Sequence, residues 1–133
     1  MIERPAIYLT KAEESLLGAE SEYANGRYDN CANRCYYACF QACVHALQRE
    51  DVTFSGPRAT WGHEQLQATF VGQLINRRKF YSPELRDVLT RALALRHVAD
   101  YSADRVSAVQ ASRALRRTRA LLSVVHQREM SPS

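Results

Sequence analysis

Four cysteines form the most regular reactive pattern in the chain, because Cys31, Cys35, Cys39 and Cys43 follow one another at strict intervals of four. Residues four apart on a helix lie on nearly one stripe, so neighbouring thiols point the same way and have poor geometry for a disulfide. Thiolates can bind a soft metal ion, but four ligands along one straight helix cannot surround a tetrahedral ion. The spacing therefore predicts small buried residues where another helix approaches closely, and we expect no metal site.

Arginine is the second group of residues with chemical potential, and it supplies 16 of the 18 basic side chains. Residues 67–133 carry twelve basic and five acidic side chains, a net charge of +7, whereas residues 1–66 carry −3. A guanidinium holds phosphate in a two-point contact that an ammonium cannot make. The C-terminal half is therefore the expected face for an anion such as a nucleotide or RNA, although a solvated helix surface would have the same composition.

A cluster of polar residues lies between residues 96 and 101, within an otherwise apolar segment of the chain. Arg96 and Asp100 are four apart, which allows an ion pair within one helix, and His97 and Tyr101 share a helix face in the same way. Arg34 interrupts an apolar run and needs a partner or a wet cleft. One interpretation makes Arg34 the buried counter-charge of Asp100 across the bundle. Tyr101 could alternatively be a core tyrosine whose hydroxyl reaches a backbone partner.

The elements that must position these residues are all predicted to be helices. Apolar residues recur at helical spacing in five segments, residues 5–24, 31–48, 63–76, 82–101 and 104–126. Pro5 suits a first helical turn, Asp29 or Asn30 can cap the second segment, and Ser82-Pro83-Glu84 can begin the fourth. The longest expected loop contains Gly56 and Pro57. These patterns predict an all-α fold, an antiparallel up-and-down bundle of about five helices.

Length and composition favour one globular domain. We expect it to cover residues 1–127, with a disordered tail at 128–133. Hydrophobic residues make up 46% and charged residues 24% of the chain, and no apolar run approaches the roughly 18 residues of a membrane span. The N-terminus lacks the apolar stretch of a signal peptide, so we expect a cytoplasmic protein. The GxGxxG, GxxxxGK and GxSxG motifs are absent, so the sequence gives no support for a Rossmann, P-loop or hydrolase interpretation, and without a CxxC motif no set of residues has zinc spacing.

Three stretches of the sequence resemble a known family. Residues 26–40, with Gly26, Tyr28 and the run Ala32-Asn33-Arg34-Cys35-Tyr36-Tyr37-Ala38-Cys39-Phe40, are similar to the G-x-Y…A-x-R-A-Y-Y-A-x-F pattern of HEPN (higher eukaryote and prokaryote nucleotide-binding) domains. Residues 96–101 resemble the R-x-x-A-D-Y segment of that family, and His63 with Leu66 and Phe70 resembles the start of its third helix. The resemblance covers about residues 5–125.

The resemblance implies a helical bundle that dimerises, with its second and fourth segments lining a shared cleft. We expect a nucleotide or RNA to bind there through Arg34, Tyr37, Arg96 and Asp100, with no cofactor. It also implies a partner protein, a minimal nucleotidyltransferase, in a toxin–antitoxin-like pair. In such pairs a cleft tyrosine can receive a nucleotide, and Tyr101 is the candidate for that modification.

Many HEPN proteins are metal-independent ribonucleases, in which an arginine is followed by a histidine with four to six residues between them. Arg96 matches the arginine, whereas Tyr101 stands where the histidine belongs. Metal-free RNA cleavage needs a base near neutral pH and a cation for the phosphorane, so Arg96, His97 and Tyr101 are the candidate catalytic residues, with His97 as a replacement base. Two alternatives remain open: an active ribonuclease toxin with a variant motif, and a non-catalytic adaptor that recruits a partner protein.

Overall fold

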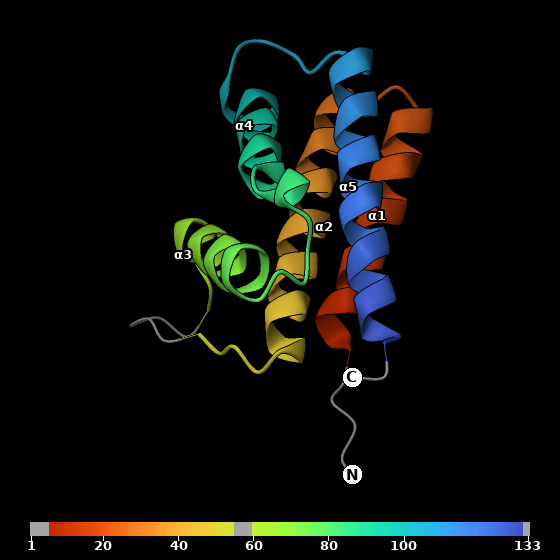
Figure 1. Cartoon of the computed structure of the whole chain (residues 1–133). Coiled ribbons are helices and arrows are strands. Elements are labelled where there is room, and N and C mark those ends of the chain that lie inside the picture. The colour runs from red at the N-terminus through yellow and green to blue at the C-terminus, as the bar shows by residue number, and fades with distance from the viewer. Residues whose placement is uncertain (1–5, 55–59, 132–133) are drawn as a thin grey trace.

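A computed structural model describes residues 6–54 and 60–131, and these residues form helices without any strand. In Figure 1 the four longest helices stand side by side and successive ones reverse direction, while the shorter α3 lies at an angle beside α2. This arrangement confirms the all-α helical bundle. The α-helices are α1 (Ile7–Ala24), α2 (Tyr28–Arg49), α3 (His63–Thr69), α4 (Val88–Tyr101) and α5 (Ala108–Glu129), with a π-helix, η1 (Phe70–Arg77), and a 3-10 helix, η2 (Pro83–Leu85), between α3 and α4.

The central helix of the bundle is α2, which packs against α1, α4 and α5 and also contacts α3. All four of its cysteines are buried and free, so the prediction of small packing residues is confirmed. Small side chains let a neighbouring backbone approach α2 closely. The Cys39 Sγ atom, for example, lies 3.5 Å from the Thr118 Oγ1 atom of α5. At Cys39 the cysteine stripe therefore packs directly against α5.

The segment predicted as one α-helix over residues 63–76 divides into two kinds of helix. It is α-helical from His63 to Thr69 and continues as the π-helix η1 to Arg77. The wider π turn allows Phe70, Leu74 and Ile75 to be buried together, although Leu74 and Ile75 are adjacent in sequence. The change to a π-helix is caused by the tertiary packing of these three large apolar side chains, which helical periodicity alone does not predict.

Three helix starts differ from their predicted positions. The first residue of α2 is Tyr28, and Asp29 does not cap it, because the Asp29 Oδ1 atom accepts a hydrogen bond from the Val106 backbone N–H at 2.8 Å. Ser82 caps a helix as predicted, but that helix is the short η2, whereas α4 begins at Val88. The α5 helix begins after Ser107, whose side chain accepts from the Gln110 N–H in a capping box.

The last helix extends past the predicted end of the domain at residue 127. It ends at Glu129, and both Arg128 and Glu129 form ion pairs with residues of the bundle. Pro5, Gly56 and Pro57, along with residues 132–133, lie outside the described residues. No helix in the described ranges is long and apolar enough to cross a membrane.

Candidate functional site

The face formed by α2 and α4 brings an arginine against two tyrosines. The Arg96 guanidinium carbon lies 5.0 Å from the centre of the Tyr36 ring and 5.2 Å from that of Tyr37. A guanidinium at this distance is attracted to the negative face of an aromatic ring. The Arg96 side chain is only 21% exposed, so the two rings hold a cation that remains in contact with solvent.

The same arginine is oriented from the other side by a carboxylate. The Arg96 Nε–H donates to the Asp100 Oδ2 atom at 3.2 Å, and the Asn33 Nδ2 atom donates to the same oxygen at 2.8 Å. The ion pair predicted within this helix is therefore confirmed. Asp100 accepts the hydrogen bond of the Nε–H, so the remaining donors of the guanidinium are its two terminal amino groups. These two groups can donate hydrogen bonds to a phosphate.

Arg34 does not pair with Asp100, and that interpretation of the sequence is wrong. Its side chain is exposed and lies beside Gly18 of α1, so it is not a buried counter-charge. The polar contact across the bundle is made by Asn33 instead. Consecutive helical residues project about 100° apart, so a one-residue error in the rotation of α2 exchanges these two positions. The structure thus separates Arg34 from the other predicted binding residues.

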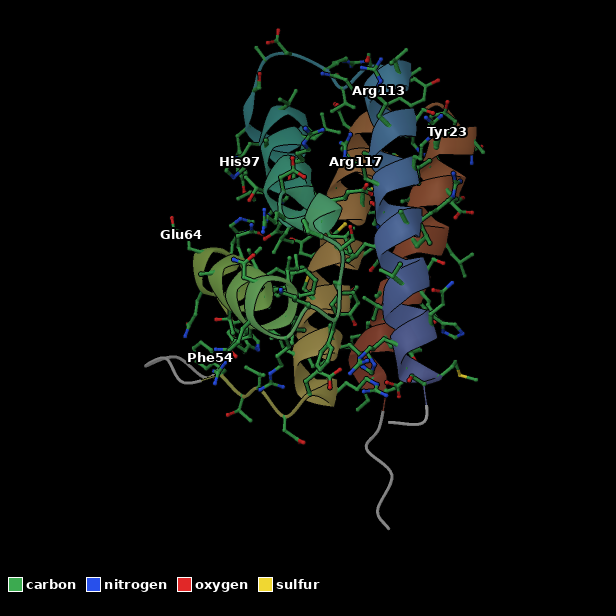
Figure 2. The ribbon with its side chains drawn as sticks, in the orientation of Figure 1. Tyr23, Phe54, Glu64, His97, Arg113 and Arg117 are labelled. Carbon is green, nitrogen blue, oxygen red and sulfur yellow. The ribbon has the colours of Figure 1, made fainter. Side chains whose placement is uncertain are left out.

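His97 and Tyr101 form a ring pair on the outer side of α4. Their ring centroids are 5.6 Å apart in an edge-on arrangement, as their spacing predicts. Figure 2 shows His97 on the side of α4 that is turned away from α5. Tyr101 is 73% exposed, so the alternative that it is a core tyrosine is wrong. Tyr37 on α2 is also exposed, and the predicted residues other than Arg34 therefore gather on one open face.

His63 is a member of this cluster that the sequence did not identify. It is the first residue of α3, and its Nδ1 atom lies 3.2 Å from the Tyr36 hydroxyl. Burial lowers the pKa of His63, and the neighbouring Glu64 opposes this effect. Burial raises the pKa of Tyr36, an effect that the nearby Arg96 charge opposes. The His63 imidazole is thus neutral at physiological pH. It contacts Tyr36, the same residue whose ring lies against Arg96.

The comparison with known protein families decides the identity of this bundle. The family model described as HEPN domain matches residues 6–129, nearly the whole chain. The chain belongs to the HEPN family. A sequence search of curated proteins found no match. HEPN domains often dimerise and bind RNA, so membership gives this chain a nucleotide- or RNA-related function at the level of the family.

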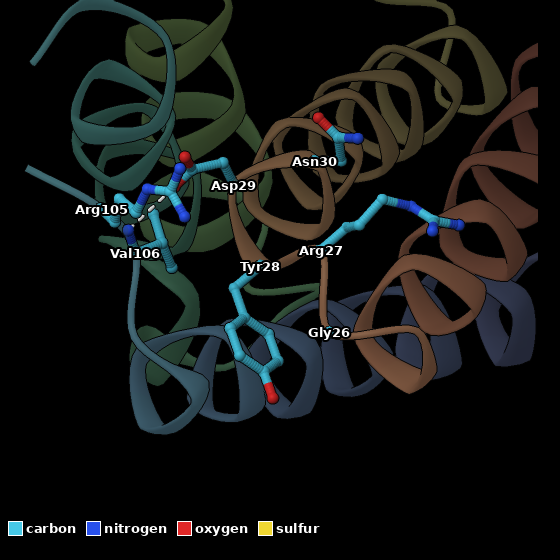
Figure 3. Close-up of a pocket in the computed structure, with 7 residues that line it drawn as sticks. All are labelled: Gly26, Arg27, Tyr28, Asp29, Asn30, Arg105 and Val106. Carbon is cyan, nitrogen blue, oxygen red and sulfur yellow. Dashed lines mark hydrogen bonds between the residues drawn. The ribbon is translucent and has the colours of Figure 1, made fainter.

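The first HEPN motif lines a concavity at the start of α2. Its volume is about 270 Å³, and Figure 3 shows the dashed bond from the Val106 backbone to Asp29 that crosses it. Gly26 has a φ of 74°, in the left-handed region where a side chain is disfavoured, so glycine allows the tight turn into α2. The hydrogen bond between Val106 and Asp29 connects the loop that follows Tyr101 to α2 of the HEPN domain. It thereby fixes the C-terminal end of α4, the helix that carries Arg96.

Burial keeps two of the four thiols of this HEPN domain in their protonated form. Burial raises the pKa of Cys39 to about 12 and that of Cys43 well above its ordinary value, so both thiols are protonated at neutral pH. A thiol must lose its proton to become a metal ligand. In residues 6–54 and 60–131, no group of three or more His, Cys, Asp or Glu side chains is placed to hold a metal ion.

Proposed function

We propose that this HEPN domain binds a nucleotide or RNA at the face formed by α2 and α4. The observation that carries the proposal is a partly exposed arginine, held by Asp100 and lying over the rings of the buried Tyr36 and the exposed Tyr37. The Arg96 amino groups contact a phosphate, and the exposed rings of Tyr37 and Tyr101 stack against bases.

We also propose that two copies share this face and that the domain pairs with a minimal nucleotidyltransferase in a toxin–antitoxin-like system. Two observations support a shared face: the 39% exposure of Tyr37 and the 73% exposure of Tyr101, both large for aromatic residues. The partner follows from the HEPN resemblance alone. Co-expression with a neighbouring nucleotidyltransferase gene, followed by intact-mass measurement, tests it, and a nucleotide added to Tyr101 is the expected product.

Anisotropy measurements with a fluorescent single-stranded RNA test the binding site. Arg96→Ala is expected to weaken binding and to reduce the salt slope of log K by about 0.7, the contribution of one phosphate contact on a single strand. Arg119→Ala is the matched control, because it removes the same charge from the far side of α5, where Arg119 pairs with Glu20 of α1. Equal losses in the two variants would refute a specific role for Arg96.

A metal-independent ribonuclease is the second candidate function. It is favoured by two imidazoles close to Arg96: His97 lies one residue away on α4, and His63 contacts the Tyr36 ring that the guanidinium covers. In this reaction an imidazole removes the ribose 2′-hydroxyl proton, and the 2′-oxygen attacks the adjacent phosphorus. The 5′-oxygen leaves with a proton from an acid, which gives a 2′,3′-cyclic phosphate, while Arg96 stabilises the charged phosphorane.

Single histidine variants distinguish the possible bases. Cleavage of a labelled RNA is measured for the parent protein, His97→Ala and His63→Ala in the presence of a metal chelator. A large loss in one variant identifies the base, and a cyclic phosphate on the product supports the route. Cleavage at the parent rate by both variants would exclude both imidazoles, and absence of cleavage by the parent would leave binding as the function.

A further inference from the structure

A groove separates α4 from α5 on the side of α4 away from His97. These two helices contact each other over a short stretch only, because each packs mainly against α2. The groove has a volume of about 420 Å³. Figure 2 shows Arg113 and Arg117 on the side of α5 that is turned to α4. Its lining consists of three aliphatic side chains, here called the floor (Ala94, Leu95 and Val98), three arginines, here called the rim (Arg91, Arg113 and Arg117), and Gln110.

The rim carries positive charge that the bundle does not neutralise. Arg91 pairs with Asp87 one turn earlier on α4, where both side chains are more than half exposed. Among the ion pairs of residues 6–54 and 60–131, none involves Arg113 or Arg117. The described lining residues include no carboxylate. The groove therefore combines an aliphatic floor with two arginines, Arg113 and Arg117, that form no ion pair within the described residues.

We propose that this groove docks an acidic amphipathic helix of a partner protein. Arg113 and Arg117 are one helical turn apart, so they match two carboxylates at positions i and i+4 of a docked helix. The aliphatic floor receives the leucine or valine side chains between those carboxylates, which is how amphipathic helices bind grooves. Charge complementarity thus sets both the partner's acidity and its helical register.

The floor favours a peptide over a nucleic acid. Single-stranded RNA gains much of its affinity from stacking on aromatic rings, and none of the described residues that line this groove is aromatic. Tyr37 belongs to α2 and Tyr101 ends α4, and neither ring is among the groove's lining residues. A partner in the groove leaves the Arg96 site open, so the two surfaces can be occupied together. This inference does not depend on nucleotide binding at Arg96.

A designed peptide of about 20 residues, with leucines and glutamates at i and i+4 on one face, is the probe. Its fluorescence anisotropy is measured with the whole protein. The double variant Arg113→Ala/Arg117→Ala is expected to weaken binding about tenfold, as the loss of two exposed ion pairs predicts. Ala94→Trp, which keeps every arginine and fills the floor, is expected to weaken it similarly. Arg116→Ala/Arg119→Ala, with the same net charge, is the matched control.

The alternatives give different results. Unchanged peptide affinity in both groove variants, or equal affinity for a peptide with lysines in place of the glutamates, would overturn the proposal. Loss of RNA binding in the arginine variant, with the peptide unaffected, would assign the groove to nucleic acid instead. A change from dimer to monomer in light scattering would assign it to a second copy of the chain. Amide shifts confined to Ala94, Leu95 and Val98 on peptide addition would support the proposal directly.

Discussion

Asp100 holds Arg96 in place within α4, with the Arg96 Nε atom 3.2 Å from the Asp100 Oδ2 atom. The pair is partly exposed, with 21% and 28% of the two side chains accessible, so its own contribution to stability is small. Its importance is geometric. Asn33 fixes the carboxylate from α2, the carboxylate fixes the guanidinium, and the Tyr36 and Tyr37 rings limit where it can move.

Asn33→Ala tests this chain of contacts without a change in charge. Loss of the hydrogen bond to Asp100 is expected to lower the free energy of unfolding by about 1 kcal/mol, measured by urea denaturation. Asn30→Ala is the control, because Asn30 is exposed and its contact with Glu22 is long, at 3.5 Å. If Arg96 needs this support, Asn33→Ala also weakens RNA binding although the arginine is intact. An unchanged affinity for RNA would show that the Tyr36 and Tyr37 rings suffice to hold Arg96 in place.

The His63 environment predicts a pH dependence of stability. Burial lowers the pKa of His63 in the folded protein, whereas the unfolded chain takes up a proton near the ordinary value of 6.5. The unfolded state therefore binds more protons below pH 6.5, and the free energy of unfolding falls as the pH decreases from 6.5 to the lower folded pKa. His63→Gln is expected to reduce the difference in stability between about pH 7.5 and about pH 5.5.

Titration by NMR checks the same prediction at the atom concerned. The His63 ring proton is expected to titrate below 6.5, while Tyr36, Glu64 and His97 are the groups whose charge or hydrogen bonding acts on it. A His63 pKa above 6.5 would contradict the burial argument. Tyr36→Phe, which removes the hydroxyl and keeps the ring, separates the hydrogen bond from desolvation.

Contacts within one helix could be predicted from the sequence. The Arg96–Asp100 ion pair and the His97–Tyr101 ring pair follow from their spacing of four, because helix geometry alone brings such residues together. The burial of the cysteine stripe follows from the wide apolar arc of its helix. The bundle and its family could be recognised for the same reason: the pattern of each helix is local.

Contacts between helices could not be predicted in this way. The choice between Asn33 and Arg34 as the neighbour of Asp100 depends on the rotation of α2 about its axis, which a single sequence does not specify. The contact of His63 with Tyr36 depends on the angle at which α3 leaves the long loop. The π-helix η1 likewise arises from the packing of its apolar residues against the bundle, not from their spacing.

The buried thiols predict a difference between two similar substitutions. Cys43→Ser places a hydroxyl among apolar neighbours and is expected to lower the free energy of unfolding by about 1–3 kcal/mol. Cys39→Ser is expected to cost less, because the Thr118 Oγ1 atom lies within reach of that side chain. A serine in either position can also bond the carbonyl four residues earlier, which affects both variants equally. Equal losses in urea denaturation would contradict this account.

The end of α5 predicts that truncation is destabilising. Arg128 donates to the Glu50 carboxylate at 2.9 Å and lies 3.7 Å from the centre of the Phe80 ring, while Glu129 accepts from the buried His45 Nε2 atom at 2.9 Å. A chain that ends at residue 127 loses all three contacts. Its free energy of unfolding is expected to fall by about 2 kcal/mol relative to a chain that ends at residue 131.

Two full-length variants separate these contacts from helix length. Glu129→Gln keeps α5 intact but removes the charge that faces His45 and Arg49, so it is expected to reproduce part of the loss. Met130→Ala changes a side chain that is 72% exposed and is expected to leave stability unchanged. If the chain that ends at residue 127 unfolds at the same urea concentration as the longer one, the ion pairs of Arg128 and Glu129 contribute nothing. The side chain of Glu50, which is 9% exposed, would then be satisfied by Arg49 alone, 3.2 Å away.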